Sequence, residues 1–83
     1  MSNSQIEQLA EELLEIETLP EMKTFLKALL TPEELKAIPL RLQIVKLLKK
    51  GVSQREIVKK LGVGIATVTR GSKEISLNHF KNV

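Results

Sequence analysis

Residues 53–71 constrain the fold most strongly, because their pattern predicts two short helices joined by a glycine turn. Ser53 and Glu56 have the spacing of a capping box, in which the two side chains satisfy free amides at the start of a helix. Gly62 is suited to the left-handed conformation that ends such a helix, and Gly64 permits a tight re-entry into the next one. The segment therefore predicts a helix-turn-helix.

The side chains of this segment favour the same helix-turn-helix as its caps and glycines. Ile57, Val58 and Leu61 recur at helical spacing and predict one buried stripe on the first helix, and Val63 is expected to fill the corner. The second helix starts with short side chains, which would let it lie deep in a DNA groove roughly 12 Å wide; they are Ala66, Thr67 and Thr69. The alternative is a plain αα-hairpin in a small bundle, but caps, turn and small-residue face agree over one continuous stretch.

Charge is divided unevenly along the chain. Residues 1–35 carry two lysines and eight glutamates, a net charge of −6, whereas residues 36–83 carry eleven Lys and Arg against Glu56 and Glu74, a net charge of +9. A basic half built around a helix-turn-helix suits a polyanion. Duplex DNA is the expected partner, and phosphate neutralisation would make its binding strongly salt-dependent.

Length and composition limit the class of protein. The 83 residues, 42% of them hydrophobic, predict a single domain over residues 1–83 with a modest core, which dimerisation would enlarge. Cysteine is absent, and His79, interpreted as an exposed tail residue, has no cysteine or aspartate with which to form a catalytic pair or a metal site. We therefore expect neither an enzyme nor a metal protein. No apolar run approaches the roughly 20 residues of a membrane span, and the acidic amino terminus is unlike a signal peptide, which predicts a cytoplasmic protein.

The rest of the chain also has helical periodicity without strand-like alternation, which predicts an all-α fold. Two amphipathic helices are expected within residues 1–30, broken near residues 18–20. Their apolar stripes are expected to form core or dimer contacts and comprise Ile6, Leu9, Leu13, Ile16, Met22, Phe25, Leu26 and Leu29.

A further helix is expected to begin at Pro32, with Thr31 as its N-cap and Glu34 closing a capping box. It would end at Gly51. Pro39 removes one backbone hydrogen bond inside it, so either one kinked helix or two consecutive short helices would fit. The residues expected to point inward are Leu35, Ile38, Leu42, Val45 and Leu48. The tail after Glu74 is too short to assign.

Several motifs within residues 28–75 match a known family. They are Leu30-Thr31-Pro32-Glu33-Glu34, Arg41 with Ile44-Val45, Ser53-Gln54-Arg55-Glu56, and the run from Gly64 to Ser72. Together they resemble the bacterial tryptophan repressor family. The resemblance implies an all-α, intertwined homodimer in which residues 1–30 are N-terminal dimerisation helices. It also implies a sequence-specific transcriptional repressor that binds a palindromic operator, with L-tryptophan or a similar amino acid as corepressor setting the spacing of the two reading heads.

The resemblance assigns DNA contacts to the helix-turn-helix. Gln54 and Arg55 would contact phosphate and flanking base edges, and the reading surface would consist of Gly64, Ile65, Ala66, Thr67 and Thr69. The chemistry suits that role, because a threonine hydroxyl donates or accepts through water and small methyl groups fit against the thymine methyl. Outside this motif the threonines would be ordinary helix-surface residues.

The resemblance also assigns a ligand pocket. Arg41 and Arg70 would enclose the indole of tryptophan, since guanidinium planes stack on aromatic faces, and Arg70 would also hold the ligand carboxylate. Gly71 would let the backbone approach the ligand. The other pocket residues would be Ile44, Val45 and, from the partner subunit, Leu30 and Thr31. Without the resemblance, the two arginines would be phosphate-facing or surface residues.

Glu74 stands where the best-known family members have a serine that helps to hold the ligand ammonium. Its carboxylate would either hold the ammonium more strongly or repel the ligand carboxylate and pair with Arg41. Two alternative functions stay open: a related DNA-binding regulator that needs no corepressor, and a helical adaptor that binds a protein partner through its acidic first helices.

Overall fold

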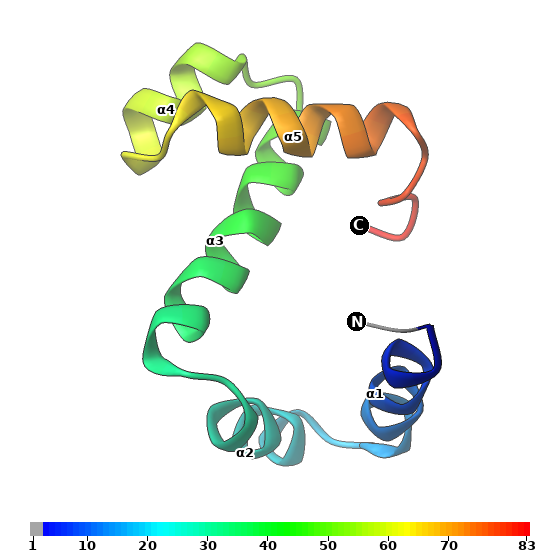
Figure 1. Cartoon of the computed structure of the whole chain (residues 1–83). Coiled ribbons are helices and arrows are strands. Elements are labelled where there is room, and N and C mark those ends of the chain that lie inside the picture. Colours follow the sequence, from blue (N-terminus) through cyan, green and yellow to red (C-terminus); the bar gives the residue numbers. More distant parts are fainter. Residues whose placement is uncertain (1–2) are drawn as a thin grey trace. The chain divides into compact units, whose positions relative to one another are not determined.

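The structure, a computed structural model, describes residues 3–83. Its helices, labelled in Figure 1, are α1 (Asn3–Glu15), α2 (Leu19–Leu29), α3 (Pro32–Lys49), α4 (Gln54–Leu61) and α5 (Ile65–Ser76). No strand is present among these residues, so the expected all-α fold is confirmed. The chain divides into two compact units, Met1–Leu35 and Lys36–Val83, which are described separately. The single domain over residues 1–83 stays a prediction.

The first unit consists of α1, α2 and the start of α3. The break predicted near residues 18–20 is confirmed, because Thr18 lies outside α2 in an extended conformation and is its N-cap. The hydroxyl of Thr18 accepts a hydrogen bond from the amide of Glu21 at 3.3 Å. Pro20 occupies the first turn, where its missing N–H has no intrahelical partner to lose.

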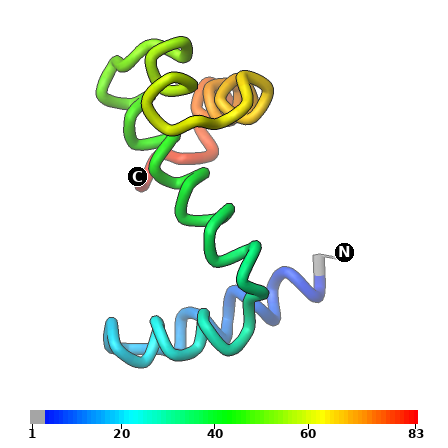
Figure 2. The backbone as a smooth tube through the Cα atoms, turned by 90° about the vertical axis from the view of Figure 1, so that its left-hand side faces the viewer, coloured from blue at the N-terminus to red at the C-terminus, as the bar shows by residue number. Residues whose placement is uncertain are grey.

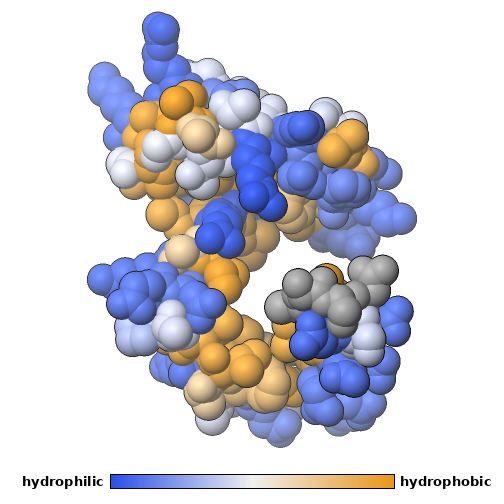
Figure 3. Space-filling model, viewed as in Figure 1, coloured by the Kyte–Doolittle hydropathy of each residue, from blue (hydrophilic) through white to orange (hydrophobic). Residues whose placement is uncertain are grey.

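Apolar side chains of the first unit are left largely uncovered. None of residues 4–35 is buried, and Leu14 and Leu19 are 84% and 73% exposed. Figure 3 shows apolar surface gathered over the segment that holds α2. In a single copy of this unit, the apolar faces of the helices are therefore not buried in a core.

The start of α3 is fixed by the predicted capping box. The amide of Glu34 donates to Thr31 Oγ1 at 3.2 Å, and the amide of Thr31 donates to Glu34 Oε1 at 2.9 Å. These hydrogen bonds, the backbone one foremost, lower the pKa of Glu34 from its ordinary value. The helix begins at Pro32, as the sequence predicts.

Pro39 lies inside one uninterrupted helix, so of the two alternatives for residues 32–49 the single helix is correct. The prediction that Ile38 and Leu42 point inward is wrong, because they are 42% and 43% exposed. The buried residues of α3 are Ile44 and Val45, in its second half. The physical reason is that only the later turns of α3 pack against α4 and α5.

Three fully buried side chains form the core of the second unit: Ile44 of α3, Ile57 of α4 and Val68 of α5. The partly buried residues packed against them are Leu47, Leu48, Val52, Val58, Leu61 and Val63. Figures 1 and 2 both show α4 and α5 lying side by side at the end of α3. Val63 contributes to this core from the turn, as predicted.

The turn between α4 and α5 has the geometry that the glycines predict. Ser53 caps α4 by accepting a hydrogen bond from the amide of Glu56 at 3.2 Å. Gly62 ends α4 in the left-handed conformation, with φ 65° and ψ 34°, and its amide donates to the carbonyl of Val58. The chain then enters α5 after Gly64, which is extended.

Replacing Gly62 tests how much this turn depends on its backbone conformation. Apart from the adjoining residues of the chain, no atom lies within 4 Å of a Cβ built at Gly62, so the cost of a side chain there is conformational rather than steric. We expect Gly62→Ala to lower the free energy of unfolding by roughly 1–2 kcal/mol, the cost of a left-handed L-residue. Gly62→Asn should cost less, because asparagine tolerates this conformation. Urea unfolding followed by circular dichroism measures both, and equal losses would contradict this explanation.

Candidate nucleic-acid interface and adjoining pocket

The side chains predicted to read DNA lie on the first turns of α5. Ile65, Ala66, Thr67 and Thr69 are exposed, as is Gly64 at the N-cap. Gly64 supplies no side-chain cap, and the first turn of α5 carries no acidic residue. Free amides and the positive end of the helix dipole are therefore open to an anion such as a phosphate.

The two other predicted DNA contacts are the first residues of α4. Arg55 is exposed, whereas Gln54 is half-buried and hydrogen-bonded to α5. The hydroxyl of Thr69 donates to Gln54 Oε1 at 2.9 Å, which links the amino-terminal part of α4 to α5. This hydrogen bond leaves the Gln54 amide nitrogen and the lone pairs of Thr69 as the groups that can face DNA.

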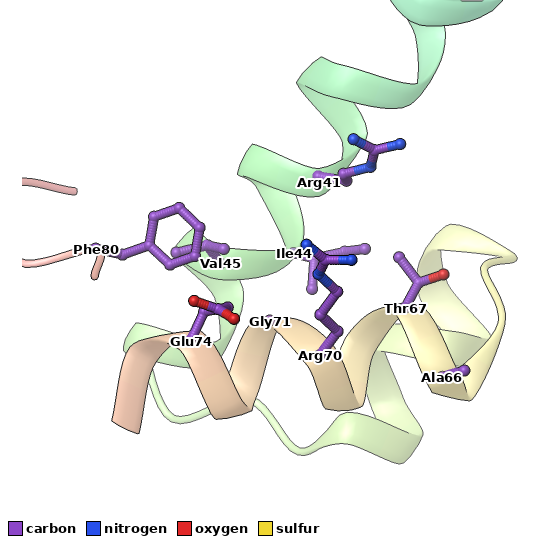
Figure 4. Close-up of a pocket in the computed structure, with 9 residues that line it drawn as sticks. All are labelled: Arg41, Ile44, Val45, Ala66, Thr67, Arg70, Gly71, Glu74 and Phe80. Atoms are coloured by element: carbon purple, nitrogen blue, oxygen red, sulfur yellow. The ribbon is translucent and has the colours of Figure 1, made fainter. Parts of the chain in front are cut away.

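A pocket of about 610 Å³ lies between α3, α5 and the tail that follows α5 (Figure 4). That volume is within the usual range for small-molecule sites. The lining residues are Arg41, Ile44 and Val45 of α3, Ala66, Thr67, Arg70, Gly71 and Glu74 of α5, and Phe80 of the tail. Every predicted pocket residue of the second unit is thus brought to one place.

Charged side chains of both signs border this pocket. In Figure 4, Arg41 and Arg70 extend into the same space from α3 and α5. Neither guanidinium has an ion pair or a side-chain hydrogen bond among residues 3–83. Glu74 follows Arg70 by one helical turn and therefore lies on the same face of α5. The pocket can present a cation and an anion to one bound molecule above an apolar floor.

Glu74 pairs with His79. The Nδ1 atom of His79 donates to Glu74 Oε2 at 2.5 Å. This hydrogen bond is the largest cause that lowers the pKa of Glu74 from its ordinary value, aided by the charges of Arg70 and Lys73 and opposed by partial desolvation. A pairing of Glu74 with Arg41, one of the two alternatives considered for Glu74, is not observed. His79, interpreted from the sequence as an exposed tail residue, is 61% exposed but holds this hydrogen bond.

Several residues differ from their expected places. Phe80 lines the pocket although the sequence left the tail unassigned, since no periodicity marks a turn of this length. Ala66 and Thr67, assigned to the DNA surface, border the pocket as well. Leu30 and Thr31 belong to the first unit, so their assignment to the pocket of a partner subunit stays a prediction.

Gly71 lies where α5 packs against α3. A Cβ built on Gly71 would lie 3.5 Å from side-chain carbons of Ile44 and Leu48 and 3.9 Å from Val45, all ordinary van der Waals distances. Alanine therefore fits without displacing the neighbouring helix. Packing alone does not explain a glycine in the interior of α5.

Two other kinds of feature are absent from the part of the chain that the structure describes. No group of three His, Asp or Glu side chains there has a geometry that could hold a metal ion. Nor does any helix in this part combine the length and the apolar character that crossing a membrane requires.

The geometry is that of a helix-turn-helix protein with a ligand-sized pocket behind its second helix. Comparison with known proteins agrees with the class. The family described as Trp repressor protein matches residues 4–82. Curated relatives named Trp operon repressor homolog include a protein of Vibrio vulnificus strain YJ016, 55% identical over 53 residues, which are 63% of this chain and 52% of the relative. The Actinobacillus succinogenes relative is 54% identical over 54 residues, 64% of this chain and 54% of its own length.

The chain therefore belongs to the Trp repressor family. Members of this family are transcriptional regulators rather than enzymes, in agreement with the sequence prediction. The chain spans about half the length of the curated relatives it matches. No solved structure is a significant match to it.

Gly71→Ala tests whether the packing of α5 against α3 requires a glycine at this position. Because the added methyl fits and alanine favours a helix interior, we expect the free energy of unfolding to rise by about 0.8–1 kcal/mol. Thermal or urea unfolding measures this change. A destabilised variant would show instead that α3 and α5 cannot accommodate even ordinary contact at this position.

Proposed function

We propose that the chain is a sequence-specific, DNA-binding transcriptional repressor that acts as a dimer on a palindromic operator. The observation that carries the proposal is the start of α5, where small exposed side chains adjoin an uncapped helix end. The core of Ile44, Ile57 and Val68 fixes this end in place. The net charge of +9 over residues 36–83 provides the attraction to phosphate. The name of the relatives, Trp operon repressor homolog, supports the same function.

The dimer is supported by the first unit. Its amphipathic helices bury none of residues 4–35 in a single copy, and exposed apolar side chains include Ile6, Leu9, Leu14, Leu19 and Leu29. A second copy that covers these faces would remove apolar surface from water at about 25 cal/mol per Å². Two reading heads related by a two-fold axis would also match a palindromic site.

The lining of the pocket supports the proposal that the corepressor is an amino acid with a large apolar side chain, L-tryptophan foremost. Arg41 and Arg70 offer a carboxylate two guanidinium groups that have no ion pair or side-chain hydrogen bond among residues 3–83. Glu74, a carboxylate whose pKa the hydrogen bond with His79 lowers from its ordinary value, offers an anion to the ligand ammonium. Ile44 and Val45 supply the apolar floor. Of the two roles open to Glu74, we choose attraction of the ammonium.

Control of DNA binding by the ligand would follow from linkage between the pocket and the reading surface. Both the pocket and the reading surface include Ala66 and Thr67, so a ligand in the pocket contacts the same turns of α5 that would enter the groove. A ligand that binds best when the two heads are correctly spaced shifts the population toward that state.

Arg55→Ala tests the DNA interface. Against duplexes selected from a random library, we expect weaker binding and a slope of log K against log salt that is smaller by about 0.9 for each phosphate that Arg55 neutralises. The selected duplexes should contain two-fold symmetric half-sites about 34–36 Å apart. Gel retardation at several salt concentrations measures the slope.

Lys36→Ala is the matched control for this experiment, because it removes an exposed cation of the same unit from α3 instead of the helix-turn-helix. It should leave the salt slope nearly unchanged. If the unmodified chain binds no duplex at low salt, the proposed repressor function is overturned and the alternative, a helical adaptor that binds a protein partner, is favoured.

Arg70→Ala and Glu74→Gln test the ligand pocket. The chain has neither Trp nor Tyr, so the fluorescence of added L-tryptophan has no protein background. We expect Arg70→Ala to weaken binding by about 10- to 100-fold, the worth of a hydrogen bond to a charged group. Glu74→Gln should weaken the binding of L-tryptophan but not that of indole-3-propionate, which has the same skeleton without the ammonium.

Calorimetry with both ligands completes this test. Stronger binding of L-tryptophan to Glu74→Gln would show that Glu74 repels the carboxylate instead. No heat and no spectral change with the unmodified chain would remove the corepressor and leave a DNA-binding regulator that needs none.

A further inference from the structure

The tail after α5 is turned back by a specific backbone motif. Asn78 has φ 64°, the left-handed conformation. The amide of Asn78 donates to the carbonyl of Ile75 at 2.9 Å, and the amide of His79 donates to the carbonyl of Glu74 at 3.1 Å. This pair of hydrogen bonds is the Schellman motif, which ends a helix and reverses the chain.

The motif explains why His79 meets Glu74. In a Schellman motif the residue after the left-handed one lies against the third residue from the helix end, and an apolar contact is usual there. Here the two positions are His79 and Glu74, so the contact becomes the hydrogen bond between Nδ1 and Oε2. It uses one oxygen of a carboxylate that lines the pocket.

A second anchor ties the tail to α3. Lys49, the last residue of that helix, donates from Nζ to the carbonyl oxygens of Phe80 at 2.6 Å and Val83 at 2.9 Å. The tail is therefore held at α5 by His79 and at α3 by Lys49. These are the two helices that form the other walls of the pocket.

The two anchors place an aromatic ring in the pocket wall. Phe80 is half-buried and lies beside Val45 and Glu74 in Figure 4. Among residues 3–83 it is the only aromatic side chain that lines the pocket. The volume of about 610 Å³ is present with the tail in this position, so the tail borders the pocket without filling it.

We propose that the tail Leu77–Val83 is a latched wall that retains an aromatic amino acid in the pocket, with Phe80 against the ligand ring and His79–Glu74 as the latch. The proposal rests on the amino-acid ligand of the proposed function. A ligand leaves when the tail opens, so weakening the latch accelerates dissociation more than it slows association.

Asn78 gives the sharpest test, because its role is to provide the turn. Asn78→Gly and Asn78→Ala both remove the side chain, but only glycine adopts positive φ without strain. We expect Asn78→Ala to raise the dissociation rate of L-tryptophan by about two- to tenfold, the range for removal of an aromatic pair. Asn78→Gly should leave the rate unchanged. Stopped-flow fluorescence of the ligand measures the rates.

Two further variants locate the effect. Phe80→Ala should accelerate dissociation as much as Asn78→Ala, and combining them should add little. Lys49→Met should also accelerate it, whereas Lys50→Met, which removes a neighbouring exposed lysine, should not. Equal dissociation rates for the unmodified chain, Asn78→Ala and Phe80→Ala would overturn the proposal.

A ligand-free measurement keeps this proposal separate from the proposed function. Nuclear Overhauser effects between the Phe80 ring and the Val45 methyl groups should be present in the unmodified chain and in Asn78→Gly, and absent from Asn78→Ala. If these effects are found but L-tryptophan does not bind, the corepressor and the retention role both fail while the closed tail stands. If they are missing from the unmodified chain, the latch itself is wrong.

Discussion

The contact among Ile44, Ile57 and Val68 is the interaction on which the rest of the second unit depends. Each residue comes from a different helix, and all are fully buried. Because interiors are close-packed, this contact fixes α4 and α5 against the end of α3 with little freedom. The amino end of α5 and the pocket between α5 and α3 are both consequences of that packing. Loosening it would therefore disturb the two candidate sites together.

Helix α5 also explains how the two sites can influence each other. Its first turns would face DNA, while Arg70, Gly71 and Glu74 face the pocket, and Ala66 and Thr67 border both. A rigid helix transmits a shift at one end to the other, so the ligand needs no separate path to the reading surface. The requirement is that the ligand binds one placement of the helix better than another.

Local signals predicted the elements well because they act within a few residues. Caps at Thr31 and Ser53 and the left-handed Gly62 fixed helix boundaries by hydrogen bonds and backbone sterics, and the structure has them where expected. Burial of Ile38 and Leu42 was predicted wrongly, since periodicity shows that a face is apolar without showing what covers it. The tail was missed for a similar reason, because Phe80 reaches the pocket through interactions between residues far apart in the sequence, such as that with Lys49.

Glu74 and His79 are best understood as a pair. A carboxylate beside a site for a ligand carboxylate would be repulsive if its charge were unopposed. His79 donates a hydrogen bond to one carboxylate oxygen of Glu74, and the positive charge of Arg70 lies one helical turn away. The negative charge of Glu74 is therefore partly balanced. The backbone hydrogen bonds of the turn that holds His79 beside Glu74 also bring Phe80 to the pocket. Glu74 and the tail after α5 thus form one local arrangement, in which the residue that would hold the ligand ammonium also anchors the wall beside it.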